Sequence, residues 1–170
     1  MICLDKFSAI PAGISLLFDT NIFVYWALDH PRFGEGCEKL VERVNDQEIE
    51  GFIPSVVLNE LLHRLMIAEI IGNHWATHPL DAVKLMKHDP DIIQQLKKPW
   101  EVYGYLSSMN FKIIEEFPGI TQSTFDLSKT YSLLAKDAAI LAYAKKFKIS
   151  SIATNDNDFT RVPWLCCWKP

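Results

Sequence analysis

Long hydrophobic runs are missing from this 170-residue sequence, and none reaches the roughly 18 residues that span a bilayer. Residues 1–7 also lack the apolar stretch of a secretory signal peptide, because Asp5 and Lys6 interrupt them. Internal repeats and low-complexity tracts are absent as well. We therefore expect a cytoplasmic protein without a membrane partner, and we do not expect a repeat or fibrous fold.

Cysteine and histidine occur without the spacing of a metal site. The four cysteines include no Cys-x-x-Cys pair, and the five histidines follow no ligand pattern. This argues against a zinc site. We expect all four cysteines to be buried, reduced thiols.

An excess of positive charge is also lacking, because the formal net charge is −4. Proteins that bind nucleic acids are usually basic, so this balance is unfavourable for such a partner. Bound metal ions would offset acidic charge locally. Lysines cluster at 97–98 and between 136 and 148. Within that second cluster we expect Lys136 to be solvated, with a phosphate contact as the alternative.

Apolar residues make up 49% of the chain, enough for one compact core, and we expect a single domain over 1–170. Short apolar runs alternate with segments of helical periodicity, which predicts an α/β fold with a mostly parallel sheet. Residues 72–110 are broken by prolines into short helical stretches and are expected to form a helical insertion. The expected strands are 14–18, 51–53, 111–114, 151–154 and an edge strand at 165–168; the clearest helices are 35–46, 55–70, 101–109 and 135–147.

Acidic residues stand at particular points of this scaffold. Asp19 and Asp156 follow expected strands, whereas Glu60 and Asp137 lie near helix starts. In open parallel sheets, both positions fall at the carboxyl edge of the strands, where sites form. Taken singly, each has an ordinary explanation as a helix cap, a surface group, a dipole partner or a turn residue. Only the combination predicts convergence on one site.

Converging carboxylates repel one another and raise one another's pKa values unless a cation lies between them. Sites made only of oxygen ligands select Mg²⁺ or Mn²⁺. One or two such ions could activate water for hydrolysis of a phosphodiester. The pattern therefore predicts metal-dependent hydrolysis of a nucleic-acid backbone.

Four segments containing these acids resemble, in order, the motifs of PIN-domain ribonucleases, and most closely the VapC-type toxins of prokaryotic toxin–antitoxin systems. They are Leu17-Phe18-Asp19-Thr20-Asn21-Ile22-Phe23, Pro54-Ser55-Val56-Val57-Leu58-Asn59-Glu60-Leu61, Lys136-Asp137-Ala138-Ala139-Ile140-Leu141-Ala142 and Ile152-Ala153-Thr154-Asn155-Asp156-Asn157-Asp158-Phe159.

The resemblance implies an α/β/α sandwich with a parallel sheet of four or five strands, and Mg²⁺- or Mn²⁺-dependent cleavage of RNA. It also implies a small antitoxin partner and a homodimer. Carried over by position, Asp19, Glu60, Asp137 and Asp156 would be catalytic and metal-binding, with Asp158 as the alternative fourth acid. Thr20, Asn21 and Thr154 would support them.

Two other functions stay open at this point. A housekeeping nuclease of RNA maturation or decay would use the same acids. A catalytically silent PIN-like binding module would not need them. The presence of all four acids favours an enzyme.

Overall fold

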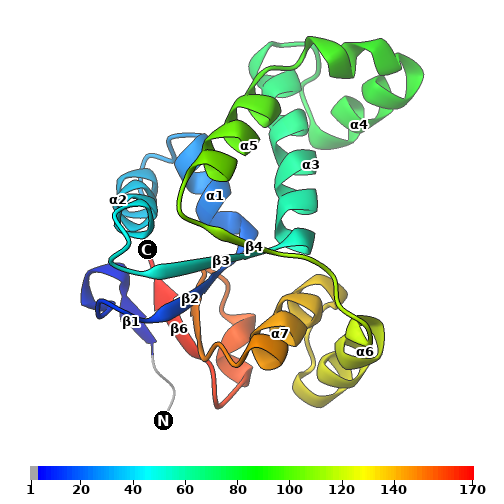
Figure 1. Ribbon diagram of the computed structural model, residues 1–170. Helices are drawn as coiled ribbons and strands as arrows, with labels where there is room; N and C mark the ends of the chain where they lie inside the picture. The colour runs from blue at the N-terminus through cyan, green and yellow to red at the C-terminus, as the bar shows by residue number, and fades with distance from the viewer. Residues whose placement is uncertain (1–3) are drawn as a thin grey trace.

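The computed structural model describes residues 4–170, which form a six-stranded parallel sheet covered by helices (Figure 1). The strand order is β1-β6-β5-β2-β3-β4, and every neighbouring pair is parallel. The predicted α/β class and parallel sheet are confirmed, with six strands in place of four or five. The strands are β1 Leu4–Lys6, β2 Ser15–Phe18, β3 Glu50–Pro54, β4 Lys112–Ile114, β5 Ser151–Ala153 and β6 Cys166–Lys169.

The additional strand is β1, and it displaces β6 from the edge of the sheet. Leu4 pairs with Cys167 and Lys6 pairs with Lys169. The prediction that residues 165–168 form an edge strand is therefore wrong. A three-residue strand containing two charged residues has too little apolar alternation to be recognised, and its partner lies at the far end of the chain.

Helices lie on both faces of the sheet. In Figure 1, α6 and α7 lie below the strands, and α1 and α2 lie above them. This is the three-layer sandwich that was predicted. The helices are α1 Thr20–Ala27, α2 Gly34–Asn45, α3 Ser55–Gly72, α4 Pro79–His88, α5 Lys98–Ser108, α6 Ile120–Tyr131 and α7 Ala135–Phe147, with 3₁₀ turns η1 Phe7–Ala9, η2 Pro90–Gln95 and η3 Asp158–Arg161.

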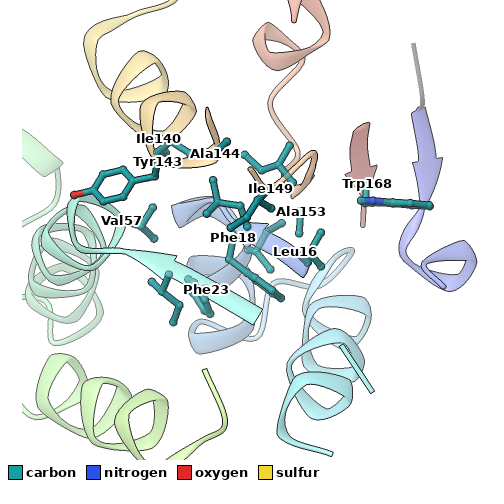
Figure 2. Close-up of a cluster of buried hydrophobic side chains, with 14 of the residues drawn as sticks. Leu16, Phe18, Phe23, Val57, Ile140, Tyr143, Ala144, Ile149, Ala153 and Trp168 are labelled. Atoms are coloured by element: carbon teal, nitrogen blue, oxygen red, sulfur yellow. The ribbon is translucent and has the colours of Figure 1, made fainter. Parts of the chain in front are cut away.

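The main core surrounds β2, whose residues Leu16 and Phe18 are fully buried. Figure 2 shows Phe18 with Phe23 of α1, Val57 of α3 and side chains of α7 around it. A strand covered on both faces needs a continuous apolar sequence, and Ser-Leu-Leu-Phe supplies one. This packing fixes the carboxyl end of β2, where Asp19 follows.

A second, smaller apolar cluster lies away from the sheet. It joins the end of α3 to α4 and η2 through Ile70, Ala82, Met86, Ile92 and Leu96. The chain then returns through α5, which packs into the main core. Figure 1 shows α4 projecting beyond the sandwich. The segment predicted as a helical insertion is thus helical, but its packing begins on α3, before residue 72.

Two further expectations concern cysteines and membranes. Cys37 and Cys167 are free and buried, whereas Cys166 is disulfide-bonded, so the expectation of reduced thiols is wrong at Cys166. A disulfide depends on two thiols meeting in space, which sequence spacing does not reveal. Cys3 lies outside the described residues. Within residues 4–170, no helix is long and apolar enough to cross a membrane.

Candidate active site

The candidate site lies where β2 and β5 end side by side at the centre of the sheet. Phe18 pairs with Ala153, and the backbone N–H of Asp19 donates to the Ala153 carbonyl at 3.0 Å. From β2 the chain continues to β3 on one side, while β5 lies on the other. In open parallel sheets, sites form at the carboxyl edge where the strand order reverses, and Asp19 and Thr154 directly follow the two strands that end there.

The Asp19 carboxylate is held by three donors. As the N-cap of α1, it accepts the backbone N–H of Thr20 at 2.6 Å through Oδ1. Its Oδ2 accepts Asn21 Nδ2 at 2.5 Å and Thr154 Oγ1 at 2.6 Å. Burial raises the pKa of Asp19, and the Thr154 hydrogen bond and the Lys136 charge offset part of that rise. The carboxylate is thereby fixed in orientation.

Glu60 reaches the same place from the second turn of α3. Its Oε2 accepts Thr20 Oγ1 at 2.6 Å and is ion-paired with the ammonium of Lys136. Its Oε1 accepts Arg64 Nε at 2.9 Å. Although burial acts to raise the pKa of Glu60, these three donors hold it below its ordinary value. Thr20 therefore joins Asp19, through its backbone, to Glu60, through its hydroxyl.

Asp137 enters from the first turn of α7 and is 6% exposed. Burial raises its pKa to about 6; Lys136 lowers it, and the charges of Asp19, Asp156 and Asp158 raise it further. A carboxyl whose pKa responds to three other acids lies in a region of concentrated negative charge. The structure therefore brings Asp137 together with the other predicted acids.

The two candidates for the fourth acid differ in their partners. Asp158 is ion-paired with Arg161 at 2.8 Å, whereas no ion pair involves the Asp156 carboxylate within residues 4–170. Thr154 Oγ1 accepts the backbone N–H of Asp156 at 3.0 Å, and Asp156 Oδ1 accepts that of Asp158 at 2.8 Å. Asp156 also raises the pKa of Asp137 more than Asp158 does. These contacts favour Asp156.

Burial singles out this region of the protein. In the described part of the chain, the buried polar or charged side chains are those of Asp19, Thr20, Asp137 and Thr154, and all four belong to this cluster. Burying carboxylates is unfavourable unless hydrogen bonds or cations compensate. Such a concentration is therefore difficult to explain by stability alone and is typical of a functional site.

Sequence reasoning did not predict the ion pairs that basic residues make with Glu60. Arg64 lies four residues after Glu60 on α3, and this helical spacing could have indicated their ion pair. No such signal existed for Lys136, because its contact with Glu60 crosses from α7 to α3. Lys136 was expected to be solvated and is instead part of the cluster.

The donor set fits a hard divalent cation. Within residues 4–170, no group of three or more His, Cys, Asp or Glu side chains is already arranged around a common metal position. The converging groups are nevertheless carboxylates and hydroxyls, and the pKa of Asp137 is raised first by burial and further by the charges of Asp19, Asp156 and Asp158. Oxygen donors with surplus negative charge suit Mg²⁺ or Mn²⁺ better than zinc.

Two solved structures share this fold at low sequence identity. The structure of VapBC2 from Rickettsia felis, bound to a DNA fragment from their promoter, matches with a TM-score of 0.58 and 18% identity over 92% of this chain and 98% of that one. VapC20 of Mycobacterium tuberculosis, described as a sarcin–ricin loop cleaving toxin, matches with a TM-score of 0.60 and 10% identity over 89% and 97% of the two chains. At these identities the likeness shows the fold alone.

Sequence comparison shows the relationship more directly. Ribonuclease VapC2 of Methanocaldococcus jannaschii is 31% identical over 150 residues, covering 88% of this chain and 90% of that protein. The PIN domain model matches residues 16–165, a range that contains every acid of the candidate site. The predicted resemblance is confirmed, and the chain belongs to the PIN domain family.

Proposed function

We propose that this protein is a metal-dependent endoribonuclease that hydrolyses RNA phosphodiester bonds, and that it is the toxin of a type II toxin–antitoxin pair. The observation that carries the nuclease proposal is the gathering of Asp19, Glu60, Asp137 and Asp156 at one sheet edge, with Asp19 and Asp137 buried. The similarity to ribonuclease VapC2 supports RNA as the substrate.

In the proposed mechanism, the four acids would hold the metal, with Asp156 preferred over Asp158. A bound Mg²⁺ or Mn²⁺ would supply an activated water and offset the charge that develops on the phosphate. The chain itself orients the ligands. Thr154 and Asn21 fix one oxygen of Asp19, and Thr20 couples Asp19 to Glu60. Ligands whose orientation is already fixed by such hydrogen bonds lose little conformational freedom when the metal binds.

An RNA cleavage assay in Mn²⁺ tests this proposal by comparing the wild type with Asp19→Asn. Asparagine keeps the size of the side chain and the acceptor for the Thr20 N–H, but it removes the charge. We expect cleavage to fall by at least roughly 100-fold, since even partners of metal ligands contribute 10- to 100-fold. Asp126→Asn is the matched control, because Asp126 is an exposed acid on α6. Equal cleavage by the wild type and Asp19→Asn would reject this site, and no cleavage by the wild type would favour a silent binding module.

The antitoxin proposal follows from the described complexes of similar fold, namely VapBC2 and a toxin–antitoxin complex from Klebsiella pneumoniae. An apolar groove between α3 and α5 offers a surface for such a partner, lined by Leu62, Trp100 and Tyr103 among others. A housekeeping nuclease is the alternative. Sequencing RNA ends after brief expression distinguishes a toxin, which cleaves few sites and arrests growth, from a maturation or decay enzyme. A homodimer remains a prediction.

A further inference from the structure

Lys136 connects the two helices that supply Glu60 and Asp137. It is the second residue of α7, and its ammonium is ion-paired with the Oε2 of Glu60 on α3. The same Oε2 accepts the Thr20 hydroxyl. The Lys136 side chain is 35% exposed and that of Glu60 19%, so water screens this pair less than a pair on the open surface.

We propose that Lys136 is an internal counter-cation that holds Glu60 when no metal is bound and competes with a divalent ion for that carboxylate. Glu60 would then join the coordination of a metal only after Lys136 releases it. This inference rests on the proposed nuclease site. It adds a residue that sets the metal affinity, and it assigns Lys136 no direct part in the chemistry.

The charges of the cluster support this role. Asp19, Glu60, Asp137 and Asp156 each contribute −1, while Lys136 and Arg64, both paired with Glu60, each contribute +1. A third basic residue, Lys169, donates from its ammonium to the Asp156 carbonyl at 2.6 Å and interacts with the charges of Asp156 and Asp19, so the remaining charge is −1, which a single divalent ion more than offsets. A second ion, or full use of Glu60 as a ligand, is favoured only if a basic side chain moves away.

Lys136 is better placed for this competition than Arg64. Its charge lowers the pKa values of Asp19, Glu60 and Asp137, three of the four acids. Arg64 acts on Glu60 and lies farther along α3, with 57% of its side chain exposed. Lys136 therefore acts on three acids of the cluster, whereas Arg64 acts on Glu60.

Calorimetric titration of Mn²⁺ into the full chain, without RNA and at constant ionic strength, tests the inference. Removing the charge with Lys136→Met should tighten Mn²⁺ binding by roughly tenfold, because a repelling cation beside the ligands is lost. Lys136→Arg keeps the charge and should bind Mn²⁺ as the wild type does. Lys145→Met is the matched control, since Lys145 is an exposed lysine on the same helix.

The direction of the change separates this role from a structural one. If Lys136 only supported the fold, its loss would loosen the site and weaken Mn²⁺ binding. Unchanged or weaker binding by Lys136→Met would overturn the inference while leaving the nuclease proposal intact. Absence of Mn²⁺ binding by every variant would overturn both. Circular dichroism verifies folding, and Lys136→Gln provides a second neutral variant should the methionine protein not fold.

Discussion

At the scale of residues, the site is a set of carboxylates whose environments differ. Asp19 is fixed by three hydrogen bonds, Glu60 is held by two cations, and Asp137 is buried among other acids. Burial and like charge disfavour the ionised form of Asp137, whereas hydrogen bonds and cations favour that of Glu60. The metal-free protein thus holds the ionised forms of Asp137 and of the buried Asp19 at an energetic cost.

This cost predicts a pH dependence of stability in EDTA. The pKa of Asp137 is raised from 3.8 to about 6 in the folded state. Between these values the folded protein keeps a proton that the unfolded chain has lost. The free energy of unfolding should therefore fall as the pH rises through that window, by roughly 1 to 3 kcal/mol. Asp137→Asn should lack this contribution.

Urea unfolding at pH 4, 5, 6 and 7 measures the effect as the difference between the wild type and Asp137→Asn. The pKa of Asp19 is raised mainly by its own burial, which is present in both proteins, and its repulsion with Asp137 is part of the Asp137 contribution that the difference measures. Asp126→Asn, altered at an exposed position, should follow the wild type. Parallel profiles for the wild type and Asp137→Asn would contradict the assigned environment of Asp137.

At the scale of elements, helix starts position the site. A separate apolar cluster holds together the projection, which consists of α4 and η2 beyond the sandwich. The first turns of α1 and α7 carry Thr20 and Asp137, and the second turn of α3 carries Glu60, to the same edge of the sheet. The end of α3, α4 and η2 instead pack on one another through a small cluster. Few contacts hold that cluster, so it should open more readily than the main core.

Ile92→Ala tests this difference in stability. Ile92 is 8% exposed within the small cluster. Its truncation should lower the free energy of local unfolding of this cluster by about 2 to 4 kcal/mol. Hydrogen exchange should accelerate in α4 and η2 and stay unchanged in α7. Leu80→Ala is the control, because Leu80 also lies on this projection and is 75% exposed. Equal acceleration in α7 would show that the projection and the sandwich unfold together.

At the scale of the whole molecule, the order of the strands decides which acids meet. β5 is adjacent to β2 although 132 residues separate the end of β2 from the start of β5 in the sequence. The acids Asp19, Asp137 and Asp156 thereby interact although they lie far apart in the sequence. A divalent ion that binds only this folded arrangement must stabilise it.

Mn²⁺ should therefore raise the melting temperature of the wild type, by about 5 to 10 °C at a concentration 100 times its Kd. Asp19→Asn should shift much less, because it loses a charged ligand. Differential scanning calorimetry with Mn²⁺ and with EDTA measures both. A full shift in Asp19→Asn would place the metal elsewhere in the protein.

Much of this fold could be predicted from the sequence because its signals are local. The helix Ala135–Phe147 has the predicted bounds, and the apolar run before Asp19 is a buried central strand. The motifs containing the acids lie at strand ends and helix starts, as their positions indicated. β1 was missed because three residues carry almost no periodicity, and β6 was misplaced because β1 covers its outer edge.

By itself, the sequence determined the elements, the family and the acids that could share a site, since residue spacing and local apolar patterns encode these. Only the tertiary structure decided which acids are buried, which have a cationic partner and with which acid Lys136 forms an ion pair. Those properties depend on contacts between α3, α7 and the ends of β2 and β5. Residues far apart in the chain make these contacts, and no local pattern records them.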